Sequence, residues 1–297
     1  MKPNILSLAL LLACAAACKE EKKYDATGTF EATEVLVSAE CGGKLTAFNV
    51  EEGDVLRQGQ ETGVVDTVQL YLKKLQLMAS RKAVDTQRPD INVQIAATKQ
   101  QIATAERERK RVLDLLNDNV ANRKQLDDWD AQIAVLKRQL AAQVSSLRNN
   151  TASLNEQSSS VAIQVAQLDD QLKKCHILSP ITGTVLAKYA EAGEVTAVGK
   201  PLFKVADLQH TYLRVYVTSG QLSRVKLGSK AKVYADFGDN KVKAYNGVVT
   251  WIASQAEFTP KTILTDDERA NQVYAVKIAI KNDGTVKLGM YGEVEFL

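Results

Sequence analysis

The sequence predicts an elongated α+β chain, in which a long antiparallel helical hairpin splits a small β domain into two halves and a small β-barrel follows. Three observations predict this fold class. Two segments repeat each other at a fixed offset, the stretch between them shows helical apolar periodicity, and the stretch after them alternates strand-like runs with turn residues. Aromatic residues form only 6% of the 297 residues, which favours long helices with a narrow apolar seam over one large core.

Residues 1–17 are interpreted as a lipoprotein signal peptide. A basic start at Lys2 precedes an apolar run from Ile5 to Ala17, which is too short to span a membrane. Cys18 follows three alanines and precedes a charged run, and this arrangement resembles a bacterial lipobox. The resemblance implies cleavage before Cys18 and a lipid on its sulfur. A lipobox at Cys14, or an ordinary signal peptide with a chance cysteine, remains open.

Residues 37–67 match residues 177–207 without a gap, at an offset of 140. Glycine marks positions where the backbone needs a positive φ or a close approach, and Val-rich runs lie between the shared glycines. Each segment is therefore expected to form short strands joined by glycine turns. The coinciding glycine pairs are Gly43 with Gly183, Gly53 with Gly193, and Gly59 with Gly199.

The two segments resemble the halves of a biotinyl/lipoyl domain. In carrier enzymes the tip between these halves presents a modifiable lysine. Here the first half ends Val65-Asp66-Thr67 without a lysine after the aspartate, and about 110 residues are inserted instead. We therefore expect no cofactor and no carrier role.

The insert is predicted to be an antiparallel coiled coil. Apolar residues recur at alternating steps of four and three over 91–116 and again over 126–172. A short junction at Asn117–Asn119 makes the two arms neighbours, and Pro89 is expected to kink or break the first arm. A plain helical bundle is the alternative.

Chemistry-bearing residues are sparse. The two histidines, His176 and His210, have no second ligand at metal spacing, and neither a phosphate-binding loop nor a catalytic motif is present. A formal net charge of +3 gives no basis for nucleic-acid binding.

We interpret Cys41 and Cys175 as small apolar side chains, although an exported location would permit a disulfide between them. We expect no catalytic residues, no metal and no cofactor.

After residue 208, five strand-like runs separated by turn residues predict a small β-barrel. The predicted boundaries, in chain order, are a signal peptide at 1–17, an N-terminal linker at 18–34, a lipoyl-like first half at 35–67, the helical hairpin at 68–175, a lipoyl-like second half at 176–208 and the barrel at 209–297.

This order of parts, over about residues 30–297, resembles the HlyD-type membrane fusion proteins, the periplasmic adaptors of tripartite efflux and secretion systems. The resemblance implies a non-enzymatic adaptor that links an inner-membrane transporter to an outer-membrane TolC-like channel. It also implies a homo-oligomer, six copies in the family pattern, in the periplasm. The lipid on Cys18 would then anchor the chain, with the inner membrane favoured.

Two stretches carry residue-level expectations from this resemblance. In the family an arginine, a leucine four later and a serine seven beyond that form the hairpin tip that meets the channel. Arg111 and Leu115 fit this motif, and Asn122 stands where serine is expected. The alternative is that Arg111 lies on a solvated helix face and Leu115 packs within the hairpin.

The stretch that begins Glu257-Phe258 and continues to residue 269 resembles adaptors of ATP-driven exporters. It implies a transporter-side loop formed by Thr259, Pro260, Lys261 and Thr262. The other readings are a mobile polar loop, a proton-driven multidrug efflux partner, or a stand-alone structural coiled-coil lipoprotein.

Overall fold

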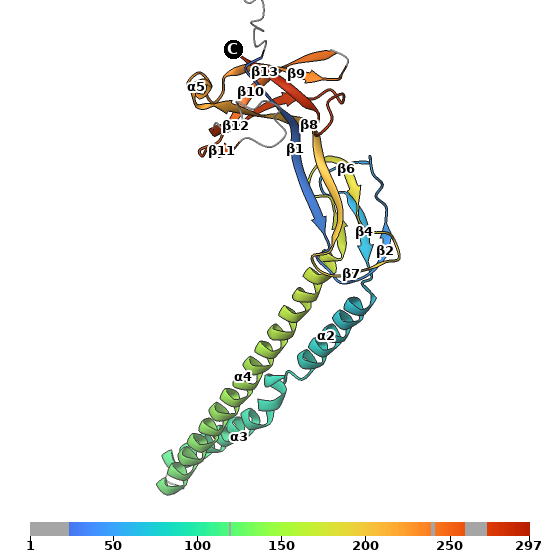
Figure 1. Ribbon diagram of the computed structural model, residues 1–297. Coiled ribbons are helices and arrows are strands. Elements are labelled where there is room, and N and C mark those ends of the chain that lie inside the picture. The colour runs from blue at the N-terminus through green and yellow to red at the C-terminus, as the bar shows by residue number, and fades with distance from the viewer. Residues whose placement is uncertain (1–23, 119, 239–240, 259–271) are drawn as a thin grey trace, which may run out of the picture. The chain divides into compact units, whose positions relative to one another are not determined.

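The computed structural model describes residues 24–118, 120–238, 241–258 and 272–297. The chain divides into two compact units (Figure 1). One contains the described residues up to Ala39 together with Leu45–Val64 and Ile177–Leu297, and the other contains Glu40–Lys44 and Val65–His176. Strands dominate the first unit and helices the second, which confirms the α+β class.

Six strands of the first unit close a β-barrel in which every neighbouring pair is antiparallel. Around the barrel they are β1 (Ala26–Ser38), β13 (Tyr291–Phe296), β9 (Lys230–Asp236), β10 (Val242–Ile252), β12 (Gln272–Lys281) and β8 (Pro201–Thr218), which returns to β1. A four-residue helix, α5 (Ser219–Leu222), follows β8, and the short strand β11 (Glu257–Phe258) pairs with β12.

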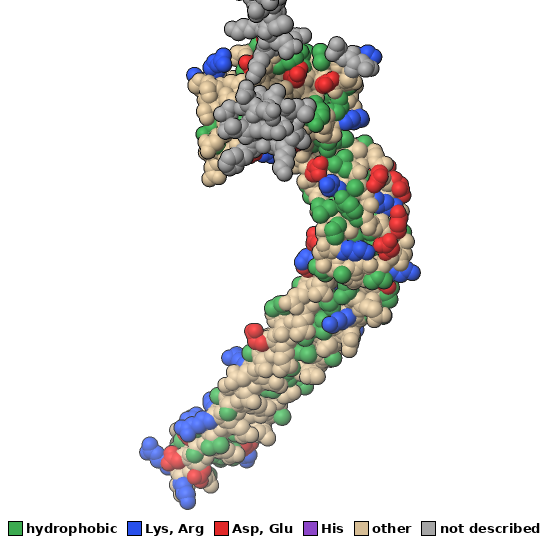
Figure 2. Space-filling view, in the orientation of Figure 1, with side chains coloured by type: hydrophobic (Ala, Val, Ile, Leu, Met, Phe, Trp, Pro, Cys, Tyr) green, Lys and Arg blue, Asp and Glu red, His purple; other side chains and the backbone are tan. Residues whose placement is uncertain are grey.

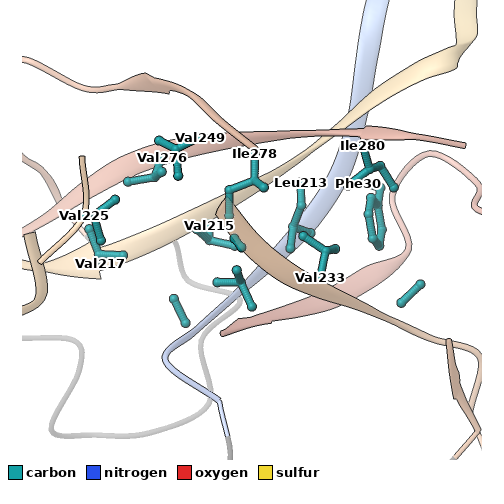
Figure 3. Close-up of a cluster of buried hydrophobic side chains, with 14 of the residues drawn as sticks. Phe30, Leu213, Val215, Val217, Val225, Val233, Val249, Val276, Ile278 and Ile280 are labelled. Carbon is teal, nitrogen blue, oxygen red and sulfur yellow. The ribbon is translucent and has the colours of Figure 1, made fainter. Parts of the chain in front are cut away.

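The barrel closes because its strands alternate apolar and polar side chains with a period of two. In β8, Leu213, Val215 and Val217 are fully buried, whereas the residues between them remain partly exposed. Figure 3 shows Leu213 and Val215 near Ile278, with Phe30 beyond Leu213 and Val217 beside Val225, all in the barrel core. Fifteen buried apolar side chains form the core cluster of the barrel, so burial of apolar surface contributes strongly to its stability.

The boundaries of the barrel differ from the expected ones. Residues 26–34 were expected in a linker, but they form the first part of β1, which pairs with β13 over Ala26–Thr29 and with β8. The boundary expected at 208 and 209 lies inside the continuous strand β8. After a register shift between Ala32 and Glu34, β1 and β8 continue together beyond the barrel.

The two repeated segments form two interleaved halves. Their strands are β2 (Gly43–Phe48), β3 (Val55–Leu56), β4 (Glu61–Val65), β5 (His176–Leu178), β6 (Gly183–Lys188) and β7 (Val195–Thr196). Strand β3 of the first half pairs with β6 of the second, while β7 of the second half adjoins β2 of the first. Each half therefore completes a sheet of the other.

The hydrogen bonds of these halves are reciprocal. The N–H of Leu45 donates to the carbonyl of Glu194 at 2.8 Å, and the N–H of Val185, its equivalent at the offset of 140, donates to the carbonyl of Asp54 at 2.9 Å. The N–H of Gly193 donates to Leu45 at 2.7 Å, as that of Gly53 does to Val185 at 2.9 Å. The sequence repeat is thus an approximate twofold symmetry of the backbone.

Three helices form the second unit. The first arm consists of α2 (Val68–Thr86) and α3 (Ile91–Asn117), and the return arm is the 52-residue helix α4 (Arg123–Lys174), about 78 Å long (Figure 1). The first arm breaks around Pro89, as predicted, and Asp90 begins α3 by accepting hydrogen bonds from the N–H groups of Asn92 and Val93. Among the described helices, none is long and apolar enough to cross a membrane.

The predicted seam of α3 is confirmed. Ile95, Thr98, Ile102 and Ala105, spaced by alternating steps of three and four, are the buried residues of this helix. The longer helix α4 buries a smaller share of its predicted seam, and α2 buries none of its residues. The buried α4 positions are Ile133, Leu154, Ser158 and Leu168.

Cys41 and Cys175 form a disulfide, so their interpretation as separate apolar side chains was wrong. Cys175 is the C-cap of α4 and is fully buried, while Cys41 lies in the Glu40–Lys44 segment of the same unit. Their Cα atoms are 5.1 Å apart, within the usual range for a disulfide. Sequence spacing did not reveal the pair because 134 positions separate the two cysteines.

Candidate functional site

The turn between α3 and α4 is closed by its own hydrogen bonds. The N–H of Val120 donates to the carbonyl of Leu115 at 2.9 Å. Asn122 is the N-cap of α4, and its side-chain oxygen accepts from the N–H of Lys124 at 3.0 Å. These bonds satisfy backbone groups that helix ends otherwise leave without partners. The described residues on both sides of the turn, 111–118 and 120–124, are held by these bonds, and we call them the hairpin tip.

The structure places Arg111 and Leu115 one helical turn apart on α3, and Asn122 across the turn from them. The Arg111 side chain is 74% exposed, and its ion pair with Glu108 is long, at 3.7 Å. Leu115 is 38% exposed, so it packs partly within the hairpin and partly faces solvent.

Val120, which the sequence analysis did not select, is 74% exposed at the hairpin tip. Its position within a run of asparagine and aspartate residues, which favour an exposed turn, could have indicated this exposure. The hairpin tip thus combines a cation with two exposed apolar side chains.

Ion pairs between the two arms brace the hairpin near its tip. Arg109 contacts Asp130 at 2.5 Å, and Lys137 contacts Glu106 at 2.8 Å. The hydrogen bond from Arg109 to Asp130, with their opposite charges, raises the pKa of the arginine. Such exposed pairs stabilise only weakly, but they join α3 to α4 at fixed positions.

A partly buried polar layer aligns the two arms further from the tip. The Thr98 hydroxyl donates to the side-chain oxygen of Gln143 at 3.1 Å, and the amide nitrogen of Gln143 donates to the carbonyl of Gln94 at 3.0 Å. Polar layers in coiled coils specify one alignment of the helices because other alignments leave these groups unpaired. The hairpin tip is therefore presented by two arms with a defined register.

Comparisons with known proteins extend over nearly the whole chain. No family model matches it. The chain is 23% identical over 287 residues to a UPF0194 membrane protein of Citrobacter koseri, across 89% of this chain and 85% of that protein. MacA from Actinobacillus actinomycetemcomitans matches with a TM-score of 0.57 at 21% identity, across 91% of this chain and 76% of MacA.

A chimera of MacA that contains the Pseudomonas aeruginosa MexA α-hairpin domain reaches a TM-score of 0.54 at 19% identity, across 91% of this chain and 80% of the chimera. The chain therefore has the same fold as MacA. The fold expected from the order of its parts is thereby confirmed.

The six predicted turn glycines of the split domain each meet a backbone requirement. Five have a positive φ that residues other than glycine rarely adopt, and at two positions, Gly43 and Gly183, a Cβ would also lie too close to a neighbour. A Cβ on Gly183 would lie 2.4 Å from the carbonyl oxygen of Ala206, and one on Gly43 would lie 2.8 Å from Val65. The four with φ between 78° and 95° are Gly53, Gly59, Gly193 and Gly199.

Where a carrier domain would present its lysine, a helix begins. Thr67 is the N-cap of α2, and the Asp66 carboxylate accepts a hydrogen bond from the N–H of Val68 at 2.9 Å. The aspartate that ends the first half therefore starts the hairpin arm. This geometry supports the expectation that the split domain carries a hairpin in place of a modified lysine.

The charged residues at the hairpin tip are unfavourable for the helix dipoles: basic residues lie at the N-terminal end of α4 and acidic residues at the C-terminal end of α3. The first turn of α4 contains Arg123 and Lys124 and no acidic residue, while Asp114 and Asp118 lie at the C-terminal end of α3. Cations weaken a helix N-terminus and anions weaken a C-terminus through the helix dipole. Figure 2 shows basic and acidic side chains gathered at this end of the hairpin. These charges therefore do not stabilise the helix ends that they adjoin.

Two expected sites lie outside the described residues. These are Cys18, the expected lipid anchor, and the loop of Thr259, Pro260, Lys261 and Thr262. The described neighbour of that loop, Glu257, pairs with Arg214 at 3.1 Å on the barrel wall.

Proposed function

We propose that this chain is a periplasmic adaptor that links an inner-membrane exporter to an outer-membrane channel. The observation that carries the proposal is the braced hairpin, whose two long arms end in the hairpin tip, with Arg111, Leu115 and Val120 exposed. A spacer of this length can connect separate protein assemblies, and nothing in the role requires bond-making chemistry. The split domain and barrel would act as the transporter-side body, and several copies, six in the family pattern, would enclose a passage.

The hairpin tip is proposed to contact the outer-membrane channel. Arg111 would supply a charged hydrogen-bonding group. Within the described residues its one ion pair, with Glu108, is long, so its guanidinium can donate to a partner. Leu115 and Val120 would add apolar contact area beside it. Asn122 would act chiefly by holding the start of α4 in place.

The location is proposed to be the periplasmic face of the inner membrane, with a lipid on Cys18. The lipobox-like sequence supports the lipid, and the Cys41–Cys175 disulfide supports an oxidising compartment. Two or three acyl chains on one cysteine would anchor firmly, since each buried CH₂ contributes about 0.8 kcal/mol.

The exporter is proposed to be an ATP-driven, ABC-type permease. Support comes from the likeness of Glu257–Thr262 and its following acidic-basic residues to adaptors of such exporters. A proton-driven efflux partner and a stand-alone coiled-coil lipoprotein remain outcomes of the following experiment.

The test is mild crosslinking in cells of the tagged, full-length chain, followed by purification and mass spectrometry. Recovery of both an ATPase-linked permease and an outer-membrane channel is the expected result. Recovery of a proton-driven transporter would overturn only the choice of exporter. Recovery of neither partner, with the protein still bound to membranes, would overturn the adaptor proposal in favour of a structural lipoprotein.

Arg111→Asp is expected to lose the channel and keep the transporter, because only the hairpin tip is changed. Arg148→Asp makes the same charge change on an exposed position of α4 away from the tip and serves as the matched control. Equal loss of the channel in both variants would contradict the tip assignment.

A further inference from the structure

One end of the barrel is tied to the start of the described chain. Asp25 donates its N–H to the carbonyl of Val294 at 2.9 Å, accepts at its carboxylate from the N–H of Phe296 at 2.9 Å, and accepts at its carbonyl from Gln221 at 2.6 Å. We call this the Asp25 end. Strand β8 ends here at Thr218, and Figure 1 marks the C-terminal residue at the same end.

The proposed lipid anchor is close to this end along the chain. Tyr24 is already held, because its ring lies 5.0 Å from that of Tyr234. Only residues 19–23 separate it from Cys18. Six peptide steps can span at most about 21 Å. If Cys18 is inserted in a bilayer, the Asp25 end must therefore lie within about this distance of the membrane surface.

A rigid loop at the Asp25 end presents one exposed leucine. Residues 223–229 connect α5 to β9, with Val225 buried beneath them. Gly228 adopts a φ of 83° and donates its N–H to the carbonyl of Val249 at 2.8 Å, so it makes a tight turn anchored to the barrel. Leu227, just before this turn, is 69% exposed.

The same loop is basic. Arg224 and Lys226 precede Leu227, Lys230 follows at the start of β9, and all three basic residues are exposed. In the part of the chain that the structure describes, none of the three takes part in an ion pair. At this end of the barrel the Asp25 carboxylate accepts a hydrogen bond from the N–H of Phe296, and Glu295 accepts one from the Tyr234 hydroxyl. The loop thus places three basic side chains close in sequence to an exposed apolar one.

We propose that the Asp25 end of the barrel rests on the membrane surface, with Leu227 among the lipid headgroups and Arg224, Lys226 and Lys230 against anionic headgroups. The inference rests on the proposed lipid anchor at Cys18. A short tether gives the loop a high effective concentration at the bilayer. Each basic residue near an anionic leaflet adds about a five-fold preference for it. A lone leucine surrounded by cations fits a headgroup layer better than a protein interface, whose centre is depleted in charge.

The test uses the full-length, lipidated protein in vesicles without any transporter. Leu227→Cys is labelled with a nitroxide, which is site-selective because Cys41 and Cys175 are paired and Cys18 carries the lipid. Accessibility to oxygen and to a water-soluble nickel chelate is measured in phosphatidylethanolamine–phosphatidylglycerol vesicles and in pure phosphatidylcholine vesicles. Val242→Cys is the matched control, because Val242 is 48% exposed and begins β10 at the opposite end of the barrel.

The expected result is protection of the Leu227 label from the nickel chelate in the anionic vesicles, with the Val242 label fully accessible. Combined Arg224→Glu, Lys226→Glu and Lys230→Glu substitutions are expected to reduce the ratio of docked to undocked barrels at least ten-fold. A Leu227 label as accessible as the Val242 label in anionic vesicles would overturn the membrane contact. Protection that appears only after a transporter is added would also overturn it, in favour of a protein contact.

Failure of the anchor is distinguishable from failure of this contact. Vesicles are first washed with alkaline carbonate, and the N-terminal peptide is analysed by mass. Loss of the protein in the wash, or an unmodified Cys18, would overturn the anchor and this inference together. Retention of the protein with an accessible Leu227 label overturns the contact alone.

Discussion

Cys41 and Cys175 are joined by a disulfide between two segments of one unit, with their Cα atoms 5.1 Å apart across 134 positions of sequence. The bond ties the C-cap of α4 to the Glu40–Lys44 segment. The N–H of Val65 also donates to the Cys175 carbonyl at 2.9 Å, so the end of the return arm is held by a covalent bond and a backbone hydrogen bond. A cross-link at this position limits fraying of the last turn of a long helix.

Replacing both cysteines by serine is expected to lower the free energy of unfolding of the hairpin unit by about 2–4 kcal/mol, because the unfolded chain regains the entropy that a long closed loop removes. Denaturant unfolding followed by circular dichroism at 222 nm measures the change. Dithiothreitol should destabilise the natural protein similarly and leave the double variant unchanged. A natural protein insensitive to the reductant under denaturing conditions would contradict the disulfide.

Two glycines of the repeat are expected to respond differently to alanine. A Cβ on Gly183 would lie 2.4 Å from the Ala206 carbonyl, whereas one on Gly193 meets nothing within 4 Å but requires a φ of 94°. Gly193→Ala should cost about 1–2 kcal/mol of stability through backbone strain alone. Gly183→Ala should cost more than about 3 kcal/mol, because two paired strands must separate. Denaturant unfolding of both variants tests the order, and equal losses would contradict it.

Periodicity predicted the parts of the structure that local spacing determines. The shared glycines marked the turns of both halves, and the step pattern of α3 located Ile95 and Ile102 in its buried seam. The first part of β1 was missed because its run from Ala26 to Ala32 has few large apolar residues and depends on Phe30 to fill the barrel core. The disulfide could not be derived from the sequence because it depends on tertiary proximity.

The candidate site was predicted unevenly for the same reason. The resemblance to the family's tip motif selected Arg111 and Leu115, and their spacing of four residues places them one helical turn apart on α3. Exposure of Val120 depends on how the turn closes against the Leu115 carbonyl, and that hydrogen bond has no sequence signature.

Acid is expected to weaken the turn that follows β12. The Lys243 ammonium and the Thr285 hydroxyl donate to the Asp283 carboxylate and lower its pKa, and Tyr245 adds a further hydrogen bond at 3.1 Å. A carboxyl group whose pKa is lower in the folded state stabilises it above the unfolded pKa of about 3.9. This contribution is lost as the pH falls below that value toward the folded pKa.

Asp283→Asn should therefore make barrel stability less dependent on pH between about 4 and 2, and Tyr245→Phe should do so partially. Unfolding midpoints measured across this range test the prediction. An unchanged pH dependence in Asp283→Asn would show that other carboxylates control acid unfolding.

Asn122 is expected to act at the hairpin tip as a helix cap, since its side-chain oxygen already accepts from the N–H of Lys124 at 3.0 Å. Asn122→Ala should lower the stability of the hairpin by about 1 kcal/mol, and Asn122→Ser should retain it, because serine caps a helix about as well as asparagine. Measuring both unfolding and channel crosslinking separates a cap from a direct contact. A cap predicts that the serine variant equals the natural protein in both measurements. Normal stability with reduced crosslinking in that variant would instead assign the amide group to the channel interface, and an alanine variant of full stability would contradict the cap.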